Sequence, residues 1–270
     1  MFRRSKIFWY LINLRNLLVV CVRTLFYCLV HPQKIATFLF ALYSVLNEFY
    51  QSSHGHLYNF EATKLFQEMK SHMAFVRCNI FNMESIVTRP NETQTLCALV
   101  SHLKPKKIFE IGTYNGFTTL HFAYNAPEDS RIYTLDLPAD FSLSDQECYS
   151  YDDILVMELS KKNIERRFFK KDSQGKKITE LFGDSKLFDF SPYQGQMDLI
   201  FIDGNHSYPY VASDTENAFK MLSPDGVIVW HDFDYIVHRD VFKYLNHLVK
   251  EHKIYSIPNT RFAIYGKQLC

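Results

Sequence analysis

The chain has 270 residues, of which 47% are apolar and 22% are charged, and both values lie near the average for globular proteins. This composition excludes a disordered chain, a collagen-like chain and a coiled coil. The formal net charge of +1 shows no global basic excess, so we expect no nucleic-acid partner. Six cysteines without a CxxC spacing exclude a small disulfide-rich scaffold and favour buried thiols in a reduced, cytoplasmic protein.

Residues 7–30 are largely apolar, but Arg15 and Arg23 interrupt the run. A membrane-spanning helix needs about 20 mostly apolar residues, and an arginine in its middle is costly. The polar residues fall largely on one side of a helical wheel, which is typical of a helix lying on a membrane surface, here the inner face. Docking on its own domain or on a partner subunit, as in a homodimer, fits equally well. The arginines and the absence of a small-residue cleavage motif argue against a cleaved signal peptide.

The apolar spacing in residues 35–50 and 62–76 predicts helices, so we expect residues 1–84 to form an N-terminal helical extension. From residue 85 onward, strand and helix patterns alternate. The expected strands cover residues 106–112, 131–137, 177–184, 197–204 and 227–233, and residues 254–267 supply a hairpin-like strand pair. This alternation predicts an α/β domain over residues 85–270, with a mostly parallel sheet and helices on both faces. Ligands of such a sheet bind at the carboxyl ends of its strands.

The first expected strand runs into a helix through a turn with glycines at positions 112 and 116. Glycines let the backbone approach a ligand closely, and the start of a helix exposes N–H donors. A dinucleotide site needs G-x-G-x-x-G, in which the second glycine makes room for pyrophosphate. Tyr114 stands at that position, which argues against a dehydrogenase. The chain also has no G-x-x-x-x-G-K-[ST] motif, which excludes a P-loop.

Acidic residues stand at the ends of three successive expected strands. Glu110 precedes the first glycine by two residues and can accept hydrogen bonds from a ligand ammonium or from loop amides. Asp136 follows Gly116 by 20 residues and can bind a ribose diol, and Asp184 can accept an adenine amino hydrogen. We call these three acids the rim of the expected site, and a cationic nucleoside ligand without phosphates matches them. S-adenosylmethionine has that description.

Six segments together resemble class I S-adenosylmethionine-dependent methyltransferases, in the small-molecule O-methyltransferase branch that includes macrocin-type and catechol-type enzymes. They are FEIGTYNGFTTL, IYTLDLP, LFGDS, DLIFIDGNHSYPYVASDTENAF, LSPDGVIVWHDF and IPNTRFAIYG. The resemblance implies a Rossmann-like, seven-stranded sheet with a reversed last strand. It implies that S-adenosylmethionine is bound by Glu110, Gly112, Thr113, Tyr114, Asn115, Gly116, Asp136, Asp184, Ser185 and Asp203.

Two further acids and two histidines follow the next two strand ends. By position, the resemblance implies that Asp203 and Asp232 are oxygen ligands of a divalent metal ion, with His231 in the place of a third ligand that is a carboxylate in catechol-type enzymes. Mg²⁺ prefers oxygen ligands, whereas imidazole suits softer ions, so either an ion such as Mn²⁺ binds or no metal binds. We expect His206, and as second choice His231, to be the base that removes the acceptor proton.

The sequence therefore predicts O-methylation of a small hydroxylated acceptor, such as a sugar, a phenol or a lipid-linked intermediate. An aminopropyl transferase would favour a turn richer in glycine. A non-catalytic nucleoside-binding module with the same fold is the alternative outside enzymes, and the retained set of Asp and His side chains argues against it. Asp214 and Glu216 are expected on a solvated helix face.

Overall fold

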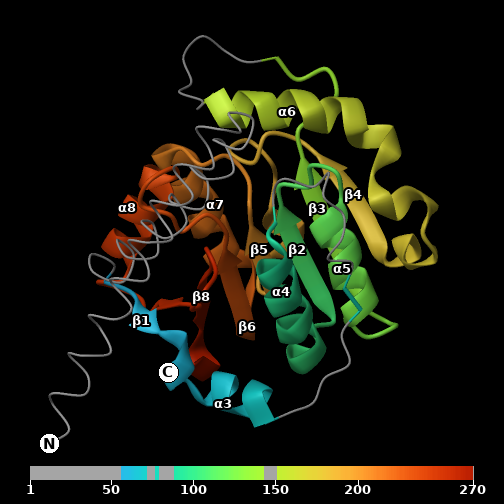
Figure 1. Cartoon of the computed structure of the whole chain (residues 1–270). Helices are drawn as coiled ribbons and strands as arrows, with labels where there is room; N and C mark the ends of the chain where they lie inside the picture. Colours follow the sequence, from blue (N-terminus) through green and yellow to red (C-terminus); the bar gives the residue numbers. More distant parts are fainter. Residues whose placement is uncertain (1–55, 72–76, 79–87, 143–150, 270) are drawn as a thin grey trace, which may run out of the picture. The chain divides into compact units, whose positions relative to one another are not determined.

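The computed structural model of the chain describes residues 56–71, 77–78, 88–142 and 151–269 (Figure 1). The chain divides into two units, residues 1–54 and residues 55–270, and every described residue belongs to the second. The predicted amphipathic helix at residues 7–30 and the predicted helix at residues 35–50 lie outside the described residues.

An eight-stranded sheet forms the centre of the described unit (Figure 1). Its order is β1-β7-β8-β6-β5-β2-β3-β4, and β8 alone runs antiparallel to its neighbours. The strands are β1 (Tyr58–Asn59), β2 (Lys107–Ile111), β3 (Arg131–Asp136), β4 (Ile178–Phe182), β5 (Met197–Ile202), β6 (Leu222–Trp230), β7 (Tyr255–Ser256) and β8 (Ala263–Gly266). The mostly parallel sheet and the reversed last strand are confirmed.

The strand count differs from the prediction by one, because β1 pairs in parallel with β7 through Tyr58 and Tyr255. A strand of two residues is too short to show an alternating pattern, so it could not be predicted from the sequence. The segment that contains β1 precedes the predicted domain start at residue 85, and its Phe60 and Leu65 are buried in the same apolar cluster as helix α4 (Pro90–Leu103). The boundary at residue 85 itself stays a prediction.

Helices cover both faces of the sheet (Figure 1). They are α3 (Lys64–Ser71), α4 (Pro90–Leu103), α5 (Phe117–Asn125), α6 (Tyr151–Asn163), α7 (Tyr208–Met221) and α8 (Arg239–Leu248). Alternate residues of a strand belong to two separate apolar clusters, because successive side chains of a strand point to opposite faces of the sheet. Phe109 belongs to the cluster with α7 and α8, whereas its neighbour Ile108 belongs to the cluster with α4 and α5.

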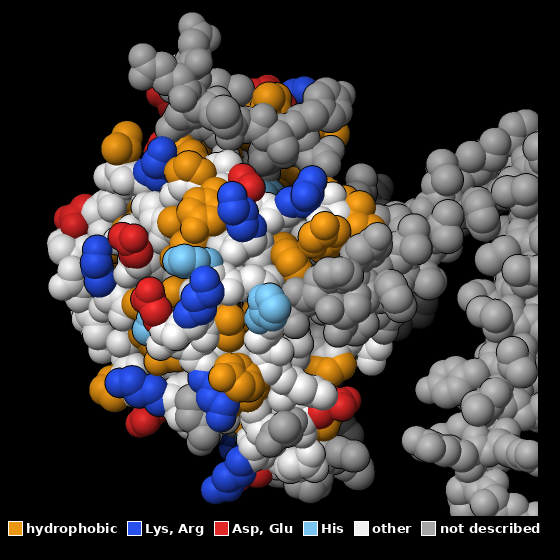
Figure 2. All heavy atoms as spheres, turned by 90° about the vertical axis from the view of Figure 1, so that its left-hand side faces the viewer, with side chains coloured by type: hydrophobic (Ala, Val, Ile, Leu, Met, Phe, Trp, Pro, Cys, Tyr) orange, Lys and Arg blue, Asp and Glu red, His pale blue; other side chains and the backbone are white. Residues whose placement is uncertain are grey.

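On the face shown in Figure 2, Lys and Arg side chains are interspersed with Asp and Glu side chains and do not gather into one basic patch. Within the described ranges, we find no helix with both the length and the apolar character needed to cross a lipid bilayer.

Candidate functional site

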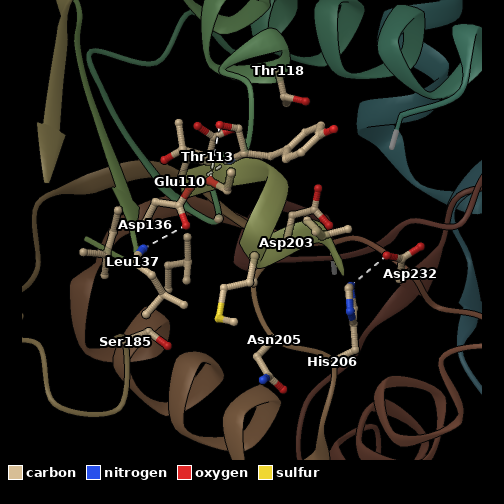
Figure 3. Close-up of a pocket in the computed structure, with 18 of the residues that line it drawn as sticks. Glu110, Thr113, Thr118, Asp136, Leu137, Ser185, Asp203, Asn205, His206 and Asp232 are labelled. Carbon is tan, nitrogen blue, oxygen red and sulfur yellow. Dashed lines mark hydrogen bonds and ion pairs between the residues drawn. The ribbon is translucent and has the colours of Figure 1, made fainter. Parts of the chain in front are cut away.

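The carboxyl ends of the parallel strands open onto a cavity of about 330 Å³ (Figure 3). Most of the site residues predicted from the sequence line it, namely Glu110, Gly112, Thr113, Tyr114, Asn115, Asp136, Asp184, Ser185, Asp203, His206 and Asp232. The three acids of the predicted rim therefore share one cavity. Gly116 and His231 do not line it.

The two glycines of the first loop are required by contacts within the protein. Gly112 has a φ of +96°, and a Cβ there would lie 1.9 Å from the carbonyl oxygen of Asp203. Gly116 has a φ of +73°, and a Cβ there would lie 2.5 Å from the ring of Phe169. Close approach of neighbouring backbone and a side chain already requires glycine at both positions, and close approach of a ligand to this loop stays a prediction. Tyr114 also has a positive φ of 49°, and it lines the cavity.

Glu110 lies on β2 and is almost completely buried. Its Oε2 accepts hydrogen bonds from the hydroxyls of Thr119 and Thr134, in place of the loop amides that the sequence suggested. Burial raises the pKa of the Glu110 carboxyl to about 8, although the two hydroxyls oppose this shift. The group is therefore mainly protonated at neutral pH, so it can offer a hydrogen-bond donor to the cavity.

Asp136 ends β3, and its carboxylate is held in place on one side. Its Oδ2 accepts hydrogen bonds from the backbone N–H of Tyr114 at 3.0 Å, the hydroxyl of Ser160 at 2.6 Å and Nη2 of Arg167 at 2.6 Å. Its Oδ1 accepts one from the backbone N–H of Leu137 at 2.8 Å (Figure 3). These contacts fix the direction in which the carboxylate faces the cavity.

The role of Arg167 was not predicted from the sequence. Its side chain has no exposed surface and pairs with both Asp136 and Glu180. Its Nε also donates to the carbonyl oxygen of Tyr114 at 3.0 Å. A buried arginine with two carboxylate partners connects the first loop to β3 and β4, and periodicity cannot reveal such a contact.

Asp184 and Ser185 follow β4 and reach the cavity beside α7. The Asp184 Oδ2 accepts a hydrogen bond from the Tyr210 hydroxyl at 3.1 Å, and its Oδ1 accepts one from the backbone N–H of Lys186. The prediction for Asp214 is wrong, because its side chain is fully buried. Burial raises the pKa of Asp214 to about 7, and the hydroxyl of Ser185 opposes this shift.

His206, Asp232 and His238 form a group at another part of the cavity wall. The Nε2 of His206 lies 2.8 Å from Oδ2 of Asp232 (Figure 3), and the Nε2 of His238 lies 3.6 Å from Oδ1 of Asp232. The two imidazole rings contact each other, with centroids 4.2 Å apart. Burial lowers the pKa of His238, while Asp232 opposes this shift, so His238 is mainly neutral at pH 7.

His231 lies behind this group and its side chain has no exposed surface. Its Nδ1 is 2.9 Å from Oδ1 of Asp203 and 3.4 Å from Oδ2 of Asp232, and its Nε2 is 3.3 Å from Oε2 of Glu92. Burial alone would lower the pKa of His231, but the surrounding carboxylates outweigh it and hold the pKa well above the usual value. A protonated imidazole outside the cavity wall cannot take a proton from an acceptor, so the structure contradicts His231 as the second-choice base.

Arg261, in the loop before β8, completes the buried cluster. Its Nη1 donates to Oδ1 of Asp232 at 2.5 Å, and its Nε and Nη2 donate to the two carboxylate oxygens of Glu92, each at 3.1 Å. Sequence reasoning missed both residues, because Glu92 lies 169 positions from Arg261 and belongs to no motif. Among the described residues, two groups have ligand atoms within 4.8 Å of one another: Asp203 with His231 and Asp232, and His206 with Asp232 and His238.

Part of the chain is similar to known methyltransferases. Residues 109–233 match the family model described as a methyltransferase domain. A caffeoyl-CoA O-methyltransferase of Stellaria longipes is 26% identical over 187 residues, which cover 67% of this chain and 68% of that protein. An uncharacterised protein of Sinorhizobium fredii is 28% identical over 140 residues, which cover 52% of this chain, so the chain spans only 14% of that protein.

A solved structure of an SAH-bound methyltransferase from Podospora anserina superposes with a TM-score of 0.46 at 16% identity, covering 81% of this chain and 92% of that one. The matched family segment contains the ends of β2, β3, β4, β5 and β6, which supply the rim of acids and the loops with His206 and Asp232. Residues 109–233 are therefore similar to methyltransferase domains, and a larger part of the chain is similar to an O-methyltransferase.

Proposed function

We propose that the cavity binds S-adenosylmethionine and that the domain transfers its methyl group to a hydroxyl of a small acceptor. The observation that supports this most directly is that Glu110, Asp136 and Asp184, from the ends of three different strands, line one cavity together with His206. Figure 3 shows Glu110, Asp136 and His206 around this cavity. S-adenosylmethionine, when bound, supplies an electrophilic methyl group on a sulfonium.

Different residues of the chain would bind different parts of the cofactor. Asp136 would accept hydrogen bonds from the ribose hydroxyls, since Arg167 and Ser160 hold its carboxylate in a fixed direction. Asp184 and Ser185 would lie at the adenine. Apolar side chains of α6 complete this part of the wall: Leu155, Val156, Met157 and Leu159. Glu110 would serve the methionine end together with the loop Gly112–Gly116.

His206 would be the base. Asp232 holds a hydrogen on Nε2 of the imidazole, which makes Nδ1 the basic nitrogen, and stabilises the imidazolium that forms. The remaining task of the protein is to hold the hydroxyl oxygen in line with the methyl group, and positioning of this kind accounts for a large part of many catalysed reactions.

The chemical class of the acceptor is proposed from a relative of the chain. One curated relative is named as a caffeoyl-CoA O-methyltransferase, which favours a phenol, while a sugar or a lipid-linked hydroxyl compound is an alternative. We propose a small molecule and no nucleic acid as the partner, in keeping with the interspersed charges in Figure 2. Binding to a membrane surface through residues 7–30 and assembly as a homodimer stay predictions.

Calorimetry with S-adenosylmethionine, its demethylated product and NAD⁺ tests the proposal. We expect both adenosyl compounds to bind and NAD⁺ not to bind. Asp136→Asn should weaken binding at least about tenfold, because one charge-assisted hydrogen bond contributes about 1.5–3 kcal/mol. The control Asp129→Asn removes an exposed carboxylate near the amino end of β3, opposite to the end that carries Asp136, and should leave binding unchanged. Binding of NAD⁺ alone would refute the assignment.

Methyl transfer from labelled S-adenosylmethionine to a panel of phenols and sugars then separates an enzyme from a binding module. We expect the wild type to form a methylated product and His206→Asn to abolish its formation. A protein that binds the cofactor with wild-type affinity and methylates no hydroxyl compound in the panel would favour the module.

A further inference from the structure

We infer that the guanidinium of Arg261 occupies the place of a divalent cation in this site, so that the chain gathers its buried carboxylates and performs its chemistry without a metal ion. This inference rests on the proposed function for its chemical meaning and deepens it, because it states how the acceptor site is built. Three observations carry it: the surroundings of His231, the contacts of Arg261 and the pairing of the buried carboxylates.

His231 does not fit the role of a metal ligand. A histidine ligates a metal through a free lone pair on a ring nitrogen. Nδ1 of His231 lies 2.9 Å from Asp203, and Nε2 lies 3.3 Å from both Glu92 and Nη2 of Arg261. Both ring nitrogens therefore already have polar partners inside the cluster, and the ring links the two acids.

Arg261 lies against the other carboxylate of the predicted metal set. Its guanidinium donates to Asp232 at 2.5 Å and to both oxygens of Glu92, and it also lines the cavity. Asp232 is 6% exposed and the side chain of Glu92 has no exposed surface, so neither carboxylate can rely on water for neutralisation. A divalent ion on Oδ1 of Asp232 would have to displace the guanidinium.

The buried carboxylates of the cluster already have cationic partners without a metal ion. Arg261 pairs with Glu92 and Asp232, and Arg89 is close enough to interact electrostatically with both acids. Buried charges persist when they are paired and hydrogen-bonded, and this network meets that condition. Mg²⁺ would add two charges and demands octahedral oxygen coordination, which a site holding an arginine and an imidazole does not offer.

Arg261 also disfavours a metal ion at the second group of side chains. His206, Asp232 and His238 have ligand atoms within 4.8 Å of one another, a set that suits a softer ion. However, an ion at Asp232 would approach the guanidinium that is 2.5 Å from that carboxylate. Repulsion from Arg261 therefore disfavours a metal there as well.

Titration of the purified wild-type chain with Mn²⁺ tests the inference without an acceptor. The electron paramagnetic resonance signal of free aqueous Mn²⁺ weakens when the ion binds to protein. We expect the wild type to leave this signal unchanged, and we expect dialysis against a chelator to change neither the unfolding temperature nor the affinity for S-adenosylmethionine. One bound Mn²⁺ per chain, lost in His238→Ala or in Asp203→Asn, would overturn the inference.

Arg261→Gln supplies the complementary measurement. Removal of the guanidinium takes a cationic partner from both Glu92 and Asp232, so the variant should bind Mn²⁺ at least about tenfold more tightly than the wild type, a change of about 1.4 kcal/mol. Arg261→Lys keeps a positive charge and should gain no such affinity for Mn²⁺. The control Arg239→Gln removes an exposed charge from α8 and should gain no affinity for Mn²⁺. A folded Arg261→Gln without such a gain would contradict the assigned place of the guanidinium.

The wild-type titration decides the question even if Arg261→Gln fails to fold. Its outcome is also separate from that of the proposed function, which fails if S-adenosylmethionine does not bind. A chain that binds the cofactor and one Mn²⁺ would refute the metal-free site alone.

Discussion

Nη2 of Arg167 lies 2.6 Å from Oδ2 of Asp136, and this pair joins an arginine with no exposed surface to the carboxylate that we assign to the ribose. The same guanidinium also pairs with Glu180 on β4. One side chain therefore connects β3, β4 and the first loop at the edge of the cavity.

Replacement of Arg167 by alanine should destabilise the domain and weaken cofactor binding. Asp136 and Glu180 would lose a buried partner, and breaking a buried ion pair from one side costs about 3–5 kcal/mol. Urea unfolding and calorimetry with S-adenosylmethionine measure the two effects. The neighbouring Arg166 is exposed, so Arg166→Ala should be nearly neutral. Equal stability of the two variants would contradict the assigned role of Arg167.

Replacement of Gly112 by alanine should be far more costly than replacement of Gly195. Both glycines have a positive φ, +96° and +67°, but a Cβ at Gly195 meets nothing within 4 Å, whereas one at Gly112 would lie 1.9 Å from Asp203 oxygen. We expect a loss of about 1 kcal/mol for Gly195→Ala from backbone strain alone. Gly112→Ala should lose more than about 3 kcal/mol or fail to fold. Chemical denaturation of both variants checks the difference, and similar losses would refute it.

The buried carboxyl of Asp214 should make stability depend on pH. Its pKa is raised from 3.8 to about 7, so the folded state holds the proton more tightly than the unfolded state. This contribution is complete below pH 3.8, declines as the pH rises towards 7 and is lost above it.

Asp214→Asn cannot titrate, so its stability relative to the wild type should increase between about pH 4 and pH 7. The increase should reach up to about 4 kcal/mol, because one pKa unit corresponds to about 1.4 kcal/mol. Unfolding free energies measured across this range test the change. Glu216→Gln on the exposed face of the same helix should show no such trend. A flat difference for Asp214→Asn would show that the side chain is ionised in the folded state.

His206→Asn should lower kcat by about 10²–10⁴-fold, the usual contribution of a general base. The affinity for S-adenosylmethionine should stay within about twofold, because Glu110, Asp136 and Asp184 lie at the ends of β2, β3 and β4 and not in the loop with His206. Steady-state kinetics with an accepted substrate, together with calorimetry, separate the two quantities. His247→Asn, an exposed histidine on α8, is the matched control. Full activity of His206→Asn would move the base to another group.

Local sequence patterns determined the frame of the protein. Alternating strand and helix signals located β2 to β5 to within about two residues, because buried strands show dense runs of apolar residues. Parallel strands place their carboxyl ends at one edge, so the sequence also determined that Glu110, Asp136 and Asp184 share a cavity. The identity of His206 as a cavity residue followed from the same rule.

Only the tertiary structure decided which partner each charge has. Glu92 meets Arg261 across 169 positions, and Arg167 meets Asp136 across 31, and neither contact leaves a periodic trace in the sequence. The burial of Asp214 and the protonation of His231 depend on groups brought together from several strands and helices. A pKa is set by burial and by nearby charges in space, so the chemistry of this site could be known only after the chain was folded.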